Sequence, residues 1–133
     1  MDNFQIAREW FNIAEMDIAS AKYLQNMYPI PVEIICYHCQ QSSEKFLKGF
    51  LSACGHEITK THDLILLNKM CQKYYVEFKS IEEECLRLTD YGVNIRYPYP
   101  MELNETDLKI AIKDAGKIKN FVIEKIESIK SGK

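Results

Sequence analysis

Apolar residues recur every three or four positions through most of the chain, which is the spacing of an α-helix. The pattern is clearest over Val32–Cys54, where it covers one broad side of the segment. That side contains Val32, Ile35, Cys36, Cys39, Ser43, Phe46, Leu47, Phe50, Leu51 and Cys54. A stripe of this width predicts a helix that is surrounded by several others.

The opposite side of this central helix is polar. Tyr37, Gln41, Glu44 and Lys48 follow one another at spacings of four, three and four residues, so they lie above one another as a polar column. The column faces either solvent or a partner or ligand. Gln40 lies at the border of the apolar stripe, where an amide is costly unless it is hydrogen-bonded.

The same periodicity predicts four further helices. They run from Asp2 or Asn3 to about Gln25, for about a dozen residues from Thr61–Asp63, from about Ser80 to Asn94, and from the Asn104 or Thr106 cap to about Ile129. Residues 74–79 are expected to form a loop or a frayed helix. The sequence therefore predicts an all-α, up-and-down helical bundle of four to five helices, with residues 1–133 forming a single domain.

Several side chains are assigned to a side of their helix. Ile13 belongs to the inward face of the first helix, whereas Arg87, Asp90, Tyr91, Asn94, Ile110 and Phe121 lie away from the core. Exposed Ile110 and Phe121 would indicate a partner surface. Asp17 lies inside the apolar face of the first helix, where a carboxylate needs a cation. We expect it to pair with Arg96 or Lys45; the alternative is that it reaches water at a helix crossing.

Composition narrows the class of protein. Hydrophobic residues make up 47% and charged residues 27%, as in an ordinary soluble domain. The formal net charge of -2 argues against a broad nucleic-acid surface but permits a small basic site. No apolar run is as long as a membrane span, and the N-terminal residues have no signal-peptide pattern. Five cysteines, an odd number, indicate reduced thiols, so we expect a cytoplasmic protein.

The cysteines, glycines and histidines were considered as possible metal, cofactor or catalytic sites. Cys36 and Cys39 resemble half of a zinc site that Cys54 and His56 could complete, but both lie on the apolar stripe, where a free cysteine packs as a small apolar residue. We therefore expect no metal. The five glycines are isolated, so no phosphate-binding loop or cofactor is expected. His62 is either a helix-start residue with local hydrogen bonds or a general acid or base.

Residues 90–100 have the most specific chemistry. Arg96 is followed by Tyr97-Pro98-Tyr99-Pro100, and the two prolines are expected to force a stiff, extended path. Arginine is suited to bidentate contact with phosphate or carboxylate, and tyrosine to stacking on a base. The alternative is that Arg96 is a structural partner of Asp17 or Glu44 across the bundle.

Four stretches together resemble the HEPN family of small helical domains, in the family's order. They are Trp10–Leu24 (WFNIAEMDIASAKYL), Cys36–Leu51 (CYHCQQSSEKFLKGFL), Thr61–Leu67 (THDLILL) and Asp90–Pro100 (DYGVNIRYPYP). The resemblance implies a helical bundle that commonly forms a homodimer and is often encoded beside a minimal nucleotidyltransferase. It also implies a nucleotide- or RNA-related function in the cytoplasm.

Many HEPN proteins resemble metal-independent ribonucleases that have an arginine, four to six residues and then a histidine. None of the three arginines here, Arg8, Arg87 and Arg96, is followed by a histidine at that spacing. The chain instead resembles the Arg-Tyr-Pro subgroup, for which the resemblance implies nucleotide binding rather than cleavage.

Three hypotheses follow. In the first, a non-catalytic dimeric module binds a nucleotide or RNA, or pairs with a nucleotidyltransferase. Its site residues would be Arg96 on phosphate, Tyr97 or Tyr91 on the base, Lys45 and Lys48 for charge, Gln41 and Glu44 for orientation, and Tyr37, Asp90 and Asp17 beside them. The second is a ribonuclease toxin that uses Arg96 with His62 or His38. The third is a structural dimeric adaptor.

Overall fold

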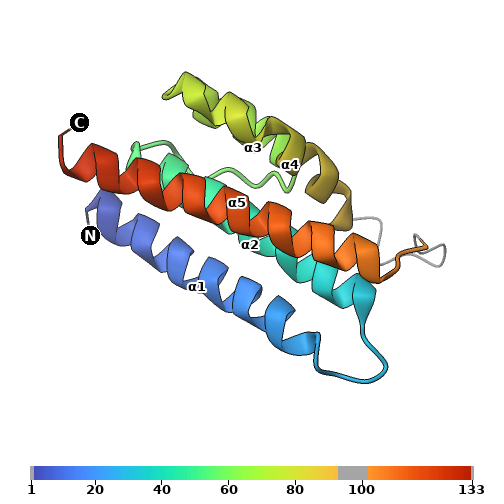
Figure 1. Ribbon diagram of the computed structural model, residues 1–133. Coiled ribbons are helices and arrows are strands. Elements are labelled where there is room, and N and C mark those ends of the chain that lie inside the picture. Colours follow the sequence, from blue (N-terminus) through green and yellow to red (C-terminus); the bar gives the residue numbers. More distant parts are fainter. Residues whose placement is uncertain (1, 93–101, 133) are drawn as a thin grey trace.

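The computed structural model describes residues 2–92 and 102–132, and every regular element in them is helical (Figure 1). The elements are α1 (Asn3–Leu24), α2 (Val32–Ala53), α3 (Leu64–Gln72), the 3₁₀ helix η1 (Val76–Ile81), α4 (Glu82–Leu88), the 3₁₀ helix η2 (Thr89–Gly92) and α5 (Glu105–Lys130). This confirms the predicted all-α bundle. The stretch left open as loop or frayed helix forms most of η1.

Helices α1, α3 and α5 begin at side chains that accept hydrogen bonds from their free amides. Asp2 and Gln5 form a reciprocal capping box at the start of α1, and Asn104 and Asp107 form another at the start of α5. Asp63 accepts hydrogen bonds from the amides of Ile65 and Leu66 and so caps α3. Each of these three caps lies among the candidates that the sequence offered.

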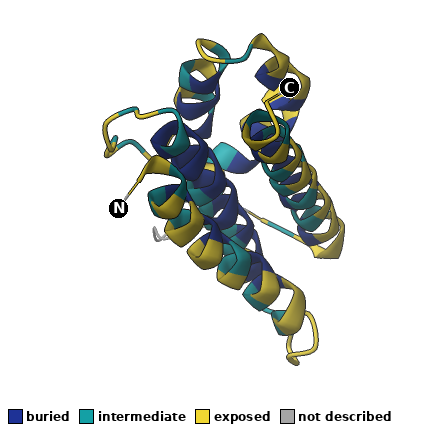
Figure 2. Ribbon diagram, turned by 90° about the vertical axis from the view of Figure 1, so that its left-hand side faces the viewer, coloured by how far each residue is buried: buried dark blue, intermediate teal, exposed yellow. Residues whose placement is uncertain are grey.

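Helix α2 is the centre of the core (Figure 2). It packs against α1 along its length, against α5 on a second side and against α3 on a third. Its fully buried side chains include Ile35, Phe46, Leu47 and Phe50. Cys36 and Cys39 are buried among them as free thiols, which confirms that they pack as small apolar residues. Among the described helices, none is long and apolar enough to cross a membrane.

Helix α3 runs in the same direction as α2, because the chain first returns along α2 in an extended segment, residues 55–63 (Figure 1). The main-chain oxygen of His62 contacts Gln40, whereas Cys71 contacts Leu47 and Tyr75 packs on Phe50. From Cys54 back to Gln40 is about 21 Å of helix, and the seven steps from Gly55 to His62 can span about 25 Å. The segment is therefore long enough to bring the chain back to the level of Gln40. As a result α3 runs parallel to α2, whereas consecutive helices of an up-and-down bundle are antiparallel.

Three side chains lie differently from the prediction. Ile13 is 51% exposed, because α1 contacts its neighbours through a narrower stripe centred on Ala7, Phe11, Ala14, Ile18 and Ala21. Phe121 is half-buried, because Phe78 of η1 covers it at 4.8 Å between ring centroids. Tyr91, in the 3₁₀ helix η2, is half-buried against the core instead of pointing away from it. Ile110 is 43% exposed, as predicted.

An ionic network joins α4 to α5. Arg87 donates two hydrogen bonds to the buried carboxylate of Asp114, at 2.8 and 2.9 Å. Lys117 lies 2.8 Å from Oε2 of the buried Glu84, while Oε1 of Glu84 is buried without a hydrogen-bond partner among the described residues. Burial opposes ionisation of Glu84, but the hydrogen bond from Lys117 and the charges of Lys117 and Arg87 outweigh it. The pKa of the Glu84 carboxyl therefore lies below its ordinary value.

We predict that Glu84→Gln lowers the free energy of unfolding at neutral pH by about 1–2 kcal/mol. A carboxyl whose pKa is depressed by folding stabilises the protein above its unfolded pKa, about 4.3 for glutamate, and this contribution is lost as the pH falls. Urea unfolding from neutral to acid pH should therefore show the gap between wild type and variant closing. Glu83→Gln, at a neighbouring residue whose side chain is 85% exposed, is the control. A gap that stays constant with pH would contradict the prediction.

Two helical glycines should respond in opposite directions to alanine. A Cβ at Gly49 of α2 would lie 2.6 Å from Cε1 of Phe11 and 3.0 Å from Cβ of Trp10, whereas a Cβ at Gly116 of α5 would meet nothing within 4 Å. We expect Gly49→Ala to destabilise by about 1–3 kcal/mol through overpacking and Gly116→Ala to stabilise by about 0.5–1 kcal/mol through helix propensity. If urea unfolding gives the same change in the free energy of unfolding for both substitutions, the contact between α1 and α2 at Gly49 is looser than described.

Candidate functional site

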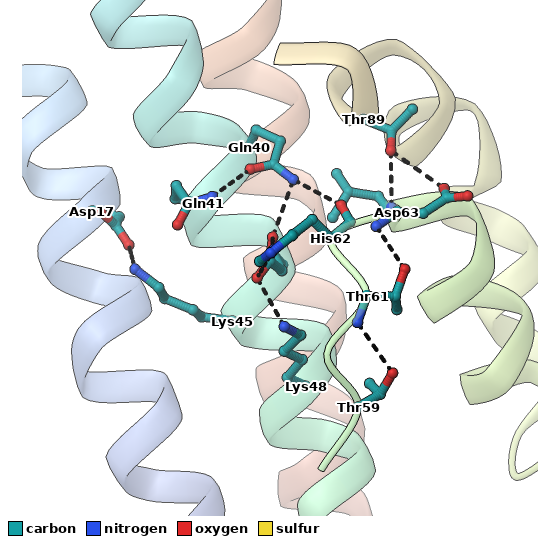
Figure 3. A network of polar contacts seen from close by, with 12 residues as sticks. Asp17, Gln40, Gln41, Lys45, Lys48, Thr59, Thr61, His62, Asp63 and Thr89 are labelled. Carbon is teal, nitrogen blue, oxygen red and sulfur yellow. Dashed lines mark hydrogen bonds and ion pairs between the residues drawn. The ribbon is translucent and has the colours of Figure 1, made fainter. Parts of the chain in front are cut away.

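Two polar networks lie side by side along a partly covered polar edge of α2 (Figure 3). The first, the Asp17 network, consists of Asp17, His38 and Lys45. Lys45 Nζ lies 2.6 Å from Asp17 Oδ2, and His38 Nδ1 lies 3.1 Å from Asp17 Oδ1. The predicted pairing of Asp17 with Lys45 is thus confirmed. All three side chains remain partly open to solvent.

The second, the Glu44 network, consists of Gln40, Gln41, Glu44, Lys48 and His62. Glu44 is buried, and Lys48 Nζ lies 2.9 Å from its Oε2. His62 Nδ1 lies 3.1 Å from both carboxylate oxygens. Gln40 donates to Glu44 Oε1 at 3.3 Å and to the main-chain oxygen of His62 at 3.1 Å, and it accepts from Gln41 at 2.8 Å. The fully buried amide of Gln40 therefore has the partners that its position requires.

Glu44 and Lys48 were predicted on the polar side of α2, and the structure shows that this side is covered. The extended segment 55–63 lies over it, and the ammonium of Lys48 lies 5.9 Å from the centroid of the Trp10 ring. A buried ion pair is tolerated when further hydrogen bonds satisfy both charges. His62 and Gln40 supply these contacts to Glu44, so the buried ion pair contributes to the structure of the bundle.

His62 has one nitrogen fixed and one directed outward. A carboxylate can only accept, so the Nδ1 atom of His62 carries the hydrogen that it donates to Glu44. The Nε2 atom of a neutral ring is then an acceptor. Because the side chain is 65% exposed, this edge of the imidazole is open to a ligand. The same reasoning assigns the Nδ1 hydrogen of His38 to its contact with Asp17.

The end of η2 adjoins the Glu44 network. A Cβ on Gly92 would lie 2.6–2.8 Å from the amide atoms of Gln40, so the backbone there approaches the network as closely as a glycine permits. Thr89 Oγ1 accepts a hydrogen bond from the Leu64 amide and donates one to Asp63, which ties η2 to the start of α3. The chain therefore enters residues 93–101 directly beside Gln40.

The remaining predicted residues have different positions. Arg96 and Tyr97 lie outside the described residues. Asp90 is exposed, and no hydrogen bond or ion pair in the described part of the chain joins Asp90 or Tyr91 to either network. Burial raises the pKa of Tyr91 to about 12, which agrees with packing against the core. The Tyr37 ring lies edge-on to His38 at 6.0 Å.

Sequence reasoning missed the central place of Gln40 and the roles of Thr89 and Gly92. The signal for Gln40 was present, since an amide at the edge of an apolar stripe needs partners. Nothing in the local sequence indicates that Gly92 packs against Gln40, because that contact links residues 52 positions apart. Across residues 2–92 and 102–132, no group of three or more His, Cys, Asp and Glu side chains is arranged to hold a metal ion.

Comparisons with known proteins agree with this architecture. The HEPN domain matches residues 7–126. The chain also superposes on the crystal structure of TT1696 from Thermus thermophilus with a TM-score of 0.81 and 25% sequence identity, over 90% of this chain and 97% of that one. No protein with a curated description matches the sequence. Because the HEPN match extends over nearly the whole chain, the protein belongs to the HEPN domain family.

Proposed function

We propose that this HEPN protein is a cytoplasmic, dimeric module that binds a nucleotide or RNA along the polar edge of α2, where His38, Lys45 and His62 reach solvent, alone or beside a minimal nucleotidyltransferase. The proposal rests on one observation: each carboxylate oxygen of Asp17 and Glu44 already has a partner within the two networks. These carboxylates therefore do not need Arg96 as a counter-ion. In this proposal the guanidinium of Arg96 binds phosphate in a bidentate manner.

Chain geometry supports a role for Arg96 at this edge. It follows Gly92 closely in the sequence, so at most about 14 Å of backbone lies between them, and Gly92 touches Gln40. Lys45 and Lys48 neutralise Asp17 and Glu44, so the edge does not repel an anion. In this proposal Tyr97 stacks on the base, since Tyr91 packs against the core. Glu44 keeps Lys48 and His62 in place, and Gln41 holds the amide of Gln40.

Isothermal titration with ATP, GTP and a short RNA tests the proposal. We expect wild type to bind at least one of them, and Arg96→Ala to weaken that binding about 10- to 100-fold, the range for a lost charged hydrogen bond. Arg8→Ala removes the same charge from an exposed position on α1 and should leave binding unchanged. Sedimentation of each variant should give two chains per particle.

Two results would count against nucleotide binding through Arg96. If wild type gives neither heat nor complex formation with any of the three ligands at saturating concentration, the module has another function. If Arg96→Ala lowers stability and leaves binding unchanged, the arginine is structural. The first result, together with an intact dimer and a loss of stability in Arg96→Ala, would favour the adaptor hypothesis.

One observation favours a ribonuclease as the second candidate. Glu44 holds the Nδ1 hydrogen of His62 and leaves Nε2 open, the arrangement in which a carboxylate orients an imidazole for proton transfer. His62 would act on the ribose 2′-hydroxyl or the leaving oxygen while Arg96 stabilises the charge on phosphate. No metal takes part in this scheme.

Overexpression separates the two candidates. A ribonuclease should arrest growth unless a partner is co-expressed, and purified protein should cleave RNA in the presence of EDTA. His62→Gln should lower cleavage about 100-fold or more, whereas His56→Gln, at the exposed loop histidine whose Nδ1 contacts the main-chain oxygen of Glu57, should not. Normal growth at high expression and intact RNA would exclude the ribonuclease and leave the binding module.

A further inference from the structure

Large apolar side chains are left uncovered on the outer face of the α1–α2 hairpin (Figure 2). Half of the large apolar side chains that are exposed in the described part of the chain belong to this one hairpin, and the others are divided among segment 55–63, α3, the turn after α3, η1, α4 and α5. An apolar surface concentrated in this way indicates a contact with another protein. We call it the hairpin face; it consists of Ile13, Met16, Ser20, Tyr23, Met27, Tyr28 and Ile34.

The part of the hairpin face that belongs to α1 has a regular repeat. Its members are separated by three, four, three and four residues, which is the spacing with which one helix packs along another. The stripe lies on the side of α1 opposite to Ala14 and Ile18, which are buried in the bundle. Helix α1 is therefore apolar on two sides, and its own chain covers only one of them. The residues of the repeat are Ile13, Met16, Ser20, Tyr23 and, in the turn after α1, Met27.

The hairpin face contains no charged residue. On its two sides along α1 lie Glu15 and Asp17, and both are paired within the chain: Glu15 with Lys119 at 2.9 Å and Asp17 with Lys45 at 2.6 Å. These carboxylates therefore neither select a basic partner nor repel a second copy of the chain. An apolar centre without charges is typical of homodimer interfaces.

The exposed area is sufficient for a stable dimer. Tyr28 is 94% exposed, Tyr23 75% and Met16 67%, and the other three large side chains of the face are each more than half exposed. At about 200 Å² for a large side chain in solvent, the six offer roughly 800 Å² to a partner. Each subunit of a standard interface buries about 800 Å².

The middle of the hairpin face is hollowed. A hollow of about 460 Å³ lies between the projecting side chains of Met16 and Tyr23, where the small Ala19 and Ser20 let another helix approach. Ile34 lies one turn before His38 on α2, so it continues the wall of the same hollow. A face with projections on both sides of a hollow can fit a rotated copy of itself. The residues that line the hollow are Met16, Ala19, Ser20, Tyr23, Leu24 and His38.

We propose that two copies of this chain pair through the hairpin face, with their α1 helices antiparallel and with Ser20 of each copy beside the two-fold axis. The inference rests on the dimeric state in the proposed function and assigns the surface that forms the dimer. Met16 of one copy packs on Tyr23 of the other, and Ile13 packs on Met27. Large side chains therefore meet on both sides of the axis, and the small serines meet at its centre.

Glu9 determines the direction of the helices. It is exposed and extends the stripe by four residues before Ile13. Parallel helices would place Glu9 against its own copy, and like charges in contact oppose association. In the antiparallel pair Glu9 lies beyond the end of the partner's helix, because α1 ends only four residues after Ser20.

Opposite charges at Ser20 test the two-fold axis. Ser20→Glu and Ser20→Arg each place two like charges beside the axis of a homodimer, so sedimentation should show the dimer Kd raised about 100-fold or more. An equal mixture of the two variants should regain dimers, and native mass spectrometry should find one chain of each kind in them. Val76→Glu and Val76→Arg, at an exposed apolar side chain of η1, are the matched controls and should leave the dimer intact.

Met16→Glu and Tyr23→Arg test the direction of the helices. Each variant alone should dimerise more weakly than wild type, because it places a charge in an apolar contact. Their mixture should regain dimers, since antiparallel helices bring the two new charges together, whereas parallel helices would not. Both side chains are exposed in the single chain, so this pair decides the matter if half-buried Ser20 does not tolerate a charge. Urea unfolding of every variant verifies that it is folded.

The outcomes separate this inference from the proposed function. A wild-type protein that stays monomeric overturns both this inference and the dimeric part of the proposed function. A dimer that both Ser20 variants leave intact, or that neither mixture restores, overturns this inference alone, because the dimer then uses another face or the hairpin face binds a different protein. Failure of ATP, GTP and RNA to bind contradicts nucleotide binding and leaves the dimer experiments unaffected.

Discussion

A buried carboxylate on the central helix α2 holds neighbouring segments of this fold together. Glu44 lies on α2 under the extended segment 55–63, where an ionised group must be surrounded by donors. Lys48 supplies the opposite charge from one turn away, and Gln40 and His62 supply the remaining hydrogen bonds. Because His62 belongs to the returning segment, the same contacts that satisfy Glu44 also hold that segment along α2.

Holding segment 55–63 in place has consequences for the rest of the bundle. The segment ends at Asp63, which caps α3 and starts it level with Gln40, so α3 runs parallel to α2. Thr89 then ties η2 to the start of α3, and Gly92 packs against Gln40. One buried amide thus contacts the central helix, the returning segment and the end of η2. Gln40 is therefore a structural residue, and it fixes the backbone at His62 and Gly92 beside the proposed binding edge of α2.

The two ends of the bundle have different chemistry. At the Gln40 end, carboxylates are neutralised by lysines and histidine nitrogens remain open, which suits a phosphate-bearing ligand. At the other end, the ends of α2 and α5 meet the start of α1 around aromatic rings, and lysine ammonium groups lie over two of these rings. Membership of the HEPN domain family accounts for the helical frame.

Local sequence was sufficient to locate the α-helices, because periodicity and capping residues act within a few positions. The caps at Asp2, Asp63 and Asn104 were all among the predicted candidates, and so was the ion pair between Asp17 and Lys45. The helix predicted over about Ser80 to Asn94 was too long, because α4 covers only Glu82–Leu88 and the chain continues as the 3₁₀ helix η2. Arg96 and Tyr97, the centre of the predicted site, stay predictions. The burial of Glu44, the direction of α3 and the contact of Gly92 with Gln40 were decided by tertiary structure alone. The periodicity of one helix places its residues relative to each other, but which face is covered depends on segments that are distant in sequence and return to it in space.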